Sequence, residues 1–173
     1  IRERLFMRRL AFLAAASLGL GVAVIVDQPA AFAGHLPAQE NEIKPGGDLS
    51  HSKLNNADLQ GANLYGVNLR DANLRGANLS SANLSDANLL GADLRFANLS
   101  AANMTDANLS DVNFSSANLT AANLSNANLS DANFSDADLT VANLNGIQAI
   151  NLKGCPASLP IGWKCENKAL IQR

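Results

Sequence analysis

The sequence predicts an all-β solenoid, and two observations carry that prediction. A large apolar residue returns at every fifth position from Leu49 to Leu144, which makes twenty repeats between Gly47 and Gly146. Ala stands two residues before this central residue in sixteen repeats, and Asn or Asp stands between the two in nineteen. A five-residue repeat cannot bury its large side chain alone, so a core forms only when successive turns of the chain stack.

A period of five fits neither regular secondary structure. Five residues of an α-helix turn by roughly 500°, so an apolar stripe would drift around the helix axis. In a long strand an odd period would send the large residue to alternate faces of the sheet. The chain must therefore turn once per repeat, with the Ala and the central residue pointing inward from a short extended segment.

Four right-angle corners close one square coil of twenty residues, so the twenty repeats make about five coils. Coils that pair through their backbones stack at roughly 4.8 Å, which gives a rod roughly 24 Å tall. The Asn before each centre suits a turning backbone and can form ladders between coils. Residues twenty apart should stack on one wall, and this register places Phe114 and Phe134 as an aromatic pair inside the core.

The repeats resemble those of the pentapeptide-repeat, or repeat-five-residue, family. The segments Ala82-Asn83-Leu84-Ser85-Asp86 and Ala92-Asp93-Leu94-Arg95-Phe96 match its pattern A(D/N)LXX. The resemblance covers residues 47–146 and implies a right-handed quadrilateral β-helix. The N-terminal segment and the C-terminal cysteines look most like those of exported members from cyanobacteria, which implies the thylakoid lumen or the periplasm.

The N-terminal segment has the pattern of a secretory signal peptide. Met7-Arg8-Arg9 precedes an uncharged run from Leu10 to Val26, and Ala31-Phe32-Ala33 offers a small-x-small cleavage site before Gly34. We expect residues 1–33 to be removed, with 1–6 as an upstream extension. A retained membrane anchor is the alternative, and the arginine pair leaves both the general and the twin-arginine export routes open.

Solenoids need caps, because an uncovered coil edge can pair with another chain. We expect residues 34–46 to form an N-terminal leading segment or short helix, and residues 147–173 to form a C-terminal cap. In the cap the repeat pattern returns out of phase at 150–154. Export makes a disulfide between Cys155 and Cys165 plausible. Trp163 is expected to cover the open core, and 166–173 to form a short helix.

The sequence offers no catalytic or cofactor motif. Neither His35 nor His51 lies in a nucleophile or metal motif, so we expect no catalytic residue, metal ligand or cofactor. Residues 96–152 contain five Asp and no Lys, Arg or Glu. The register predicts stacked acidic pairs that form a candidate cation site or docking face, or simply a solvated face. This candidate acidic face consists of Asp86, Asp106, Asp111, Asp131 and Asp136.

A second candidate is an interaction surface in the first half of the rod. Arg75 and Arg95 should stack, with Phe96 projecting beside them, and Tyr65 also points outward. Arginine beside an exposed aromatic residue is typical of binding surfaces, although an incidental surface placement is the alternative.

Three functions remain open from the sequence. The first is a non-catalytic, monomeric scaffold that binds another protein of the lumen or periplasm and meets a membrane only during export. The second is a DNA mimic that binds topoisomerases, as some members of the resembled family do. The signal peptide and a net charge of −4 for residues 34–173 disfavour it, and we expect no binding to nucleic acid. The third is a cation-binding protein that uses the stacked Asp columns. It is the weakest, because Ca²⁺ needs several oxygens converging on one point.

Overall fold

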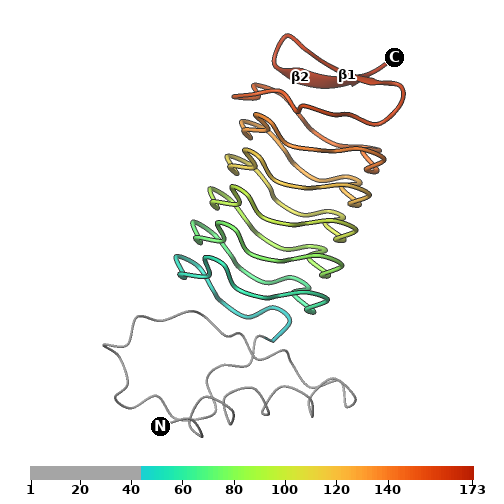
Figure 1. Ribbon diagram of the computed structural model, residues 1–173. Helices are drawn as coiled ribbons and strands as arrows, with labels where there is room; N and C mark the ends of the chain where they lie inside the picture. Colours follow the sequence, from blue (N-terminus) through green and yellow to red (C-terminus); the bar gives the residue numbers. More distant parts are fainter. Residues whose placement is uncertain (1–43) are drawn as a thin grey trace, which may run out of the picture.

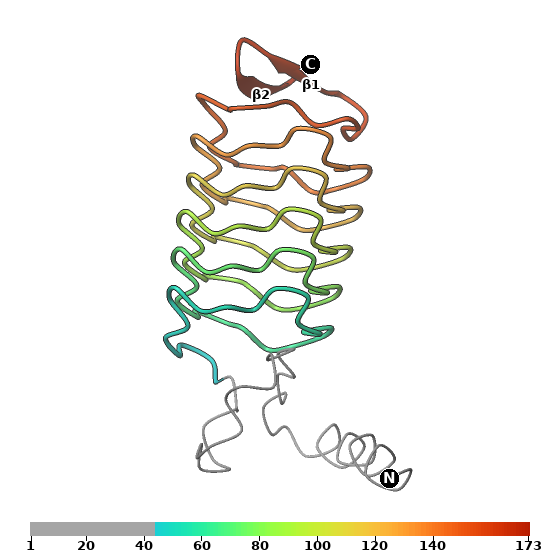
Figure 2. The same cartoon turned by 60° about the vertical axis from the view of Figure 1, so that its left-hand side comes forward.

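The computed structural model describes residues 44–173 (Figure 1). From Lys44 the chain winds as a stack of flat coils to the C-terminus, and a second view shows the same continuous column (Figure 2). The predicted signal peptide, residues 1–33, and most of the leading segment 34–46 lie outside the described residues.

Neighbouring coils are joined by isolated parallel β-bridges that recur every five residues along the chain. These bridges link residues twenty apart, from Asp48 with Asn68 through to Asn128 with Gln148. The backbone N–H of Leu84 donates to the carbonyl of Asn103 in the next coil at 2.7 Å. The predicted twenty-residue register is therefore confirmed.

Each corner is a tight turn that begins at the central residue. The N–H of Ala87 donates to the carbonyl of Leu84 at 3.1 Å, and Asp86, two residues after the centre, has a φ of 57°. A bond from residue i+3 back to residue i with positive φ at i+2 is the signature of a type II turn. The same left-handed backbone recurs at the second residue after every centre from Leu49 to Leu144.

The core is one continuous cluster of Ala and Leu side chains. Ala82 and Leu84 are both fully buried, as the inward-facing pair predicted for each repeat. Phe114 and Phe134 stack inside the core with ring centroids 5.0 Å apart and planes 11° apart, which confirms the predicted aromatic pair.

The Asn before each centre acts through its side chain, not through an unusual backbone. Its Oδ1 accepts the N–H two residues later, as Asn83 does from Ser85 at 3.2 Å. Its Nδ2 donates down the wall, as Asn103 does to Asn83 at 3.3 Å. The expected ladder is confirmed, but the role of Asn in the turn is corrected: the left-handed residue is three positions further along the chain.

The C-terminal cap is a β-hairpin, so the predicted helix at 166–173 is wrong. Strands β1 (Trp163–Glu166) and β2 (Ala169–Gln172) pair antiparallel across a two-residue turn. Strand β2 continues the stack, because the N–H of Leu170 donates to the carbonyl of Ala149 at 3.3 Å. A strand can satisfy the open backbone edge of the last coil, whereas a helix uses its own N–H groups internally.

The cap is fixed by packing and by a covalent bond. Leu170 is buried and Trp163 packs partly buried against the core, so Trp163 takes part in covering the open end as expected. The predicted disulfide joins Cys155 to Cys165, with Cα atoms 5.9 Å apart, and ties the last coil to β1. The out-of-phase repeat shifts the register by one residue, so Asn133 pairs with Gly154.

Candidate interaction surface

Phe96 is a departure from the repeat on the outside of the rod. It occupies the left-handed corner position, with a φ of 61°, and its side chain is 56% exposed. Positive φ is unfavourable for a bulky residue, and the same column holds the small residues Gly76 and Ser116 one coil away. The fold therefore holds an aromatic ring in solvent at a corner that favours Gly or Asn.

Arg75 lies over the ring of Phe96. Its guanidinium carbon is 5.0 Å from the ring centroid, within the range of a cation–π contact. Among residues 44–173 Arg75 forms no ion pair. A cation–π contact uses none of the guanidinium N–H groups as hydrogen-bond donors to a carboxylate, so Arg75 can still bind a carboxylate from another molecule.

Arg95 shares the column of Arg75 but pairs with Asp93. Its Nε and one terminal nitrogen donate to the two carboxylate oxygens of Asp93 at 2.8 and 2.6 Å. These hydrogen bonds from Arg95 lower the pKa of Asp93 and raise the pKa of Arg95. Arg75 and Arg95 are thus stacked as the sequence predicted, but of the two only Arg75 has no carboxylate partner among the described residues.

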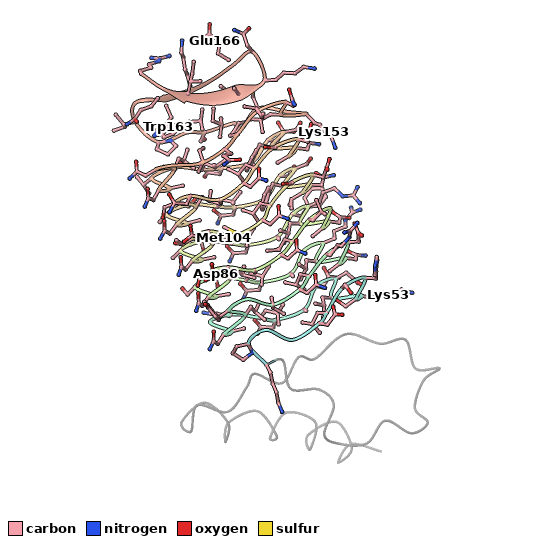
Figure 3. All side chains as sticks on the ribbon, turned by 180° about the vertical axis from the view of Figure 1, so that it is seen from behind. Lys53, Asp86, Met104, Lys153, Trp163 and Glu166 are labelled. Carbon is pink, nitrogen blue, oxygen red and sulfur yellow. A yellow bond between two sulfur atoms is a disulfide. The ribbon has the colours of Figure 1, made fainter. Side chains whose placement is uncertain are left out.

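Tyr65 belongs to a different corner. It is 49% exposed, and its hydrogen bond to Asp86 raises the pKa of its hydroxyl. In Figure 3 Asp86 lies on the opposite side of the stack from Lys53, which precedes the corner that carries Arg75 and Phe96. The structure therefore divides the predicted interaction surface in two: Arg75, Arg95 and Phe96 lie together, and Tyr65 lies apart, beside the corner that carries Asp86 and Asp106.

The predicted acidic pairs share columns but do not form a single site. Asp86 and Asp106 are twenty residues apart at one corner, and Asp111 and Asp131 share the next corner. Asp111 is bound by Lys153, whose Nζ lies 3.0 Å from Oδ1. Within residues 44–173 no three His, Cys, Asp or Glu side chains come together in a way that could hold a metal ion.

Two ion-pair partners of the candidate residues, Asp93 of Arg95 and Lys153 of Asp111, were not predicted, and only Asp93 could have been found from the sequence. Asp93 replaces the usual Asn one position before a centre, and Arg95 follows two residues later on the same side of the strand. The ion pair of Asp93 with Arg95 could be predicted, because residues two apart in an extended segment point to the same side. The ion pair of Lys153 with Asp111 could not be predicted, because Lys153 reaches Asp111 only after the register has shifted in the cap.

His51 and Asp71 form the one histidine–carboxylate contact in the part of the chain that the structure describes. The Nδ1 of His51 is 3.9 Å from the carboxylate of Asp71, and both side chains are exposed. No helix of that part has the length and apolar character needed to cross a membrane.

A family model described as pentapeptide repeats matches residues 46–80, 77–116 and 107–146. These matches together span more than half of the chain. The chain belongs to the pentapeptide repeat family. Members of this family fold as right-handed quadrilateral β-helices, and they are generally structural or interaction proteins without enzymatic activity. The fold class predicted from the period is thereby confirmed.

Solved structures of other family members are similar to the chain. A pentapeptide repeat protein from the Arabidopsis thaliana thylakoid lumen is 37% identical over 57% of this chain and 69% of its own, with a TM-score of 0.56. A pentapeptide repeat protein from Nostoc PCC 7120 is also 37% identical, over 58% of this chain and 83% of its own, with a TM-score of 0.40. QnrB1, a plasmid-mediated fluoroquinolone resistance protein, is 23% identical over 60% of each chain, with a TM-score of 0.34. No curated protein sequence matches this chain.

Proposed function

We propose that this pentapeptide repeat protein is an exported, non-catalytic scaffold that binds another protein through the corner formed by Arg75 and Phe96. The observation that carries the proposal is the exposed ring of Phe96, which is held at a left-handed backbone position. The guanidinium of Arg75 lies against this ring and pairs with no carboxylate of residues 44–173. Strained positions that the fold retains are concentrated at binding sites. An aromatic residue beside an arginine also has the composition of an interface hot spot.

Export to the thylakoid lumen or the periplasm is supported by three features. Residues 1–33 have the pattern of a signal peptide, and Cys155 and Cys165 are joined in a disulfide, which is typical of oxidising compartments. The similar protein from Arabidopsis thaliana is a thylakoid lumen protein. The protein then has about five coils between an N-terminal leading segment and the hairpin cap.

The topoisomerase-binding alternative gains no support from the surface. A DNA mimic needs continuous negative charge along its length, whereas Arg70, Arg75 and Arg95 place positive charge on the first half of the rod. The cation-binding alternative likewise lacks a set of converging carboxylates among the described residues.

The test is affinity capture in the native host, from the full-length chain with a C-terminal tag. Three chains are compared: the parent, Phe96→Ser and Tyr65→Ser. Tyr65→Ser is the matched control, because it removes an exposed aromatic residue from the other corner. We expect a partner from the exported compartment that is retained by the parent and the control and is at least tenfold depleted with Phe96→Ser. Equal capture by all three chains contradicts the proposed surface, and a tagged chain found in the cytoplasm contradicts export.

A further inference from the structure

The corner that carries Phe96 is one straight column of five residues with small or short neighbours around the ring. From the N-terminal end it reads Asn56, Gly76, Phe96, Ser116 and Asp136, each twenty residues after the last and each with positive φ. We call this set the Phe96 column. Gly76 and Ser116 are small, and Phe96 is 56% exposed between them.

Charge is distributed unevenly along this column. One coil before Phe96, Arg75 carries a positive charge that forms no ion pair within residues 44–173, because the carboxylate of Asp93 is bound by Arg95. Above Phe96, Asp136 is exposed and forms no ion pair in the same part of the chain. One face thus has a free cation on one side of an exposed aromatic ring and a free anion on the other.

We infer that two copies of this chain pair through the Phe96 column, antiparallel and about a twofold axis that passes between Phe96 and Ser116. With the axis there, residues at equal heights above and below it face each other. Phe96 of one copy meets Ser116 of the second copy, and Gly76 meets Asp136. Arg75 directly precedes Gly76, so it lies beside Asp136 of the second copy, and symmetry forms this pair twice.

The same axis also gives the fullest overlap of the two rods. The bridged ladder runs from Asp48 to Ser158, and its midpoint lies close to the level halfway between Phe96 and Ser116. The two Phe96 rings then flank the axis at heights that differ by about one coil spacing, ~4.8 Å, so each ring is buried by the other and by a serine. A parallel pairing would place Arg75 beside Arg75 and Asp136 beside Asp136.

The contact is small, since a single corner of each rod takes part. Interfaces below about 1,200 Å² are characteristic of weak and transient complexes. The dimer is therefore concentration-dependent and is weakened by salt, because its two ion pairs are at the surface. This pairing differs from the monomer expected from the sequence. It uses the same corner as the proposed function, so the second copy and the partner protein compete for Phe96.

The test is sedimentation equilibrium of the chain produced from its full-length sequence in an exporting host, from about 1 μM to about 1 mM at low salt. The variants are Arg75→Glu, Asp136→Arg and Phe96→Ser, with Tyr65→Ser as the control on another corner. We expect the parent and the control to dimerise and each of the three variants to raise Kd at least tenfold. An equimolar mixture of Arg75→Glu and Asp136→Arg restores association. In that heterodimer one of the two symmetry-related contacts has its charges exchanged, and the other is the native pair of Arg75 with Asp136.

Each outcome decides the inference. Restored association of the two charge-reversed variants supports it and also shows that both variants are folded. A parent that stays monomeric to about 1 mM overturns it, and so does a dimer that the three variants leave unchanged. A monomer that still captures a partner through Phe96 overturns only the pairing. A dimer with no captured partner overturns only the proposed scaffold function.

Discussion

Replacing Phe114 and Phe134 by Leu tests whether the stacked rings stabilise the rod as a pair. Leu occupies seventeen of the twenty central positions, so it enters the core without a change of backbone. Both rings are fully buried, with centroids 5.0 Å apart. Each substitution opens roughly 25 Å³, which costs about 0.6 kcal/mol. It also removes a stacked pair worth about 0.5–1.5 kcal/mol beyond its buried area.

We therefore expect each single substitution to lower the free energy of unfolding by about 1–2 kcal/mol. The ring pair can be lost only once, so the double variant should lose about 0.5–1.5 kcal/mol less than the two singles added together. The assay is urea denaturation followed by circular dichroism, on the parent, both singles and the double variant. The control cycle pairs Met104→Leu with Phe134→Leu, which lie on different walls and should be additive within about 0.5 kcal/mol. A coupling energy no larger than that of the control would refute the reasoning, and the rings would then act only as fillers of the core.

Three further predictions concern the cap, the corners and the acid range. Changing both Cys155 and Cys165 to Ser should lower the free energy of unfolding by about 2–3 kcal/mol, measured by urea denaturation, because the ten-residue separation closes a short loop in the unfolded chain. Gly154→Ala should cost about 1–3 kcal/mol in the same assay, because its Cβ would collide with Ser135 Oγ and lie 3.0 Å from the Ser135 nitrogen. Gly61→Ala is the control and should lower the free energy of unfolding by about 1 kcal/mol. No atom lies within 4 Å of the added Cβ, and only the φ of 65° is unfavourable. The hydrogen bonds from Arg95 hold the pKa of Asp93 below its ordinary value of 3.8, so the stabilisation by this carboxylate is present above about pH 4 and is lost as the pH falls through the lowered pKa. In acid titrations of thermal unfolding, Asp93→Asn should therefore lose less stability than the parent below about pH 4, by under about 1 kcal/mol because the pair is partly exposed.

The coil and its contents were predictable because the period of five is so restrictive. Neither a helix nor a long strand can keep every fifth residue on one side, so the corner, the square and the twenty-residue register follow from counting. Once that register holds, the stacking of Phe114 on Phe134 follows directly. The shared columns of Arg75 with Arg95 and of Asp111 with Asp131 follow in the same way.

The period does not predict the structure beyond the last repeat. It also does not predict which of two equivalent side chains forms an ion pair. The five-residue repeat ends at Gly146, so the register no longer predicts the structure. The sequences of 163–166 and 169–172 are by themselves compatible with a helix or a hairpin. The backbone edge left by the last coil decides for a hairpin, because the N–H of Leu170 in β2 donates to the carbonyl of Ala149, and the carbonyl of Lys168 in the hairpin turn accepts from Leu152. Similarly, the register makes Arg75 and Arg95 equivalent members of one column, and only the contact with Asp93 distinguishes Arg95 from Arg75 in the proposed interaction surface.

The regularity of this fold also makes the proposed interaction surface visible as a set of exceptions. Every corner position on the rod has positive φ, and the residues found there are mostly Gly, Asn, Asp, Ser and Ala, which are small or tolerate that backbone. Phe96 and Val141 are the large apolar exceptions among the corners from His51 to Gly146. Of these two, only Phe96 has a guanidinium on its ring. Phe96 stabilises neither the corner nor the core, and it lies one coil from Arg75, whose charge is unpaired within residues 44–173. A contact with another molecule therefore best explains why Phe96 occupies this position.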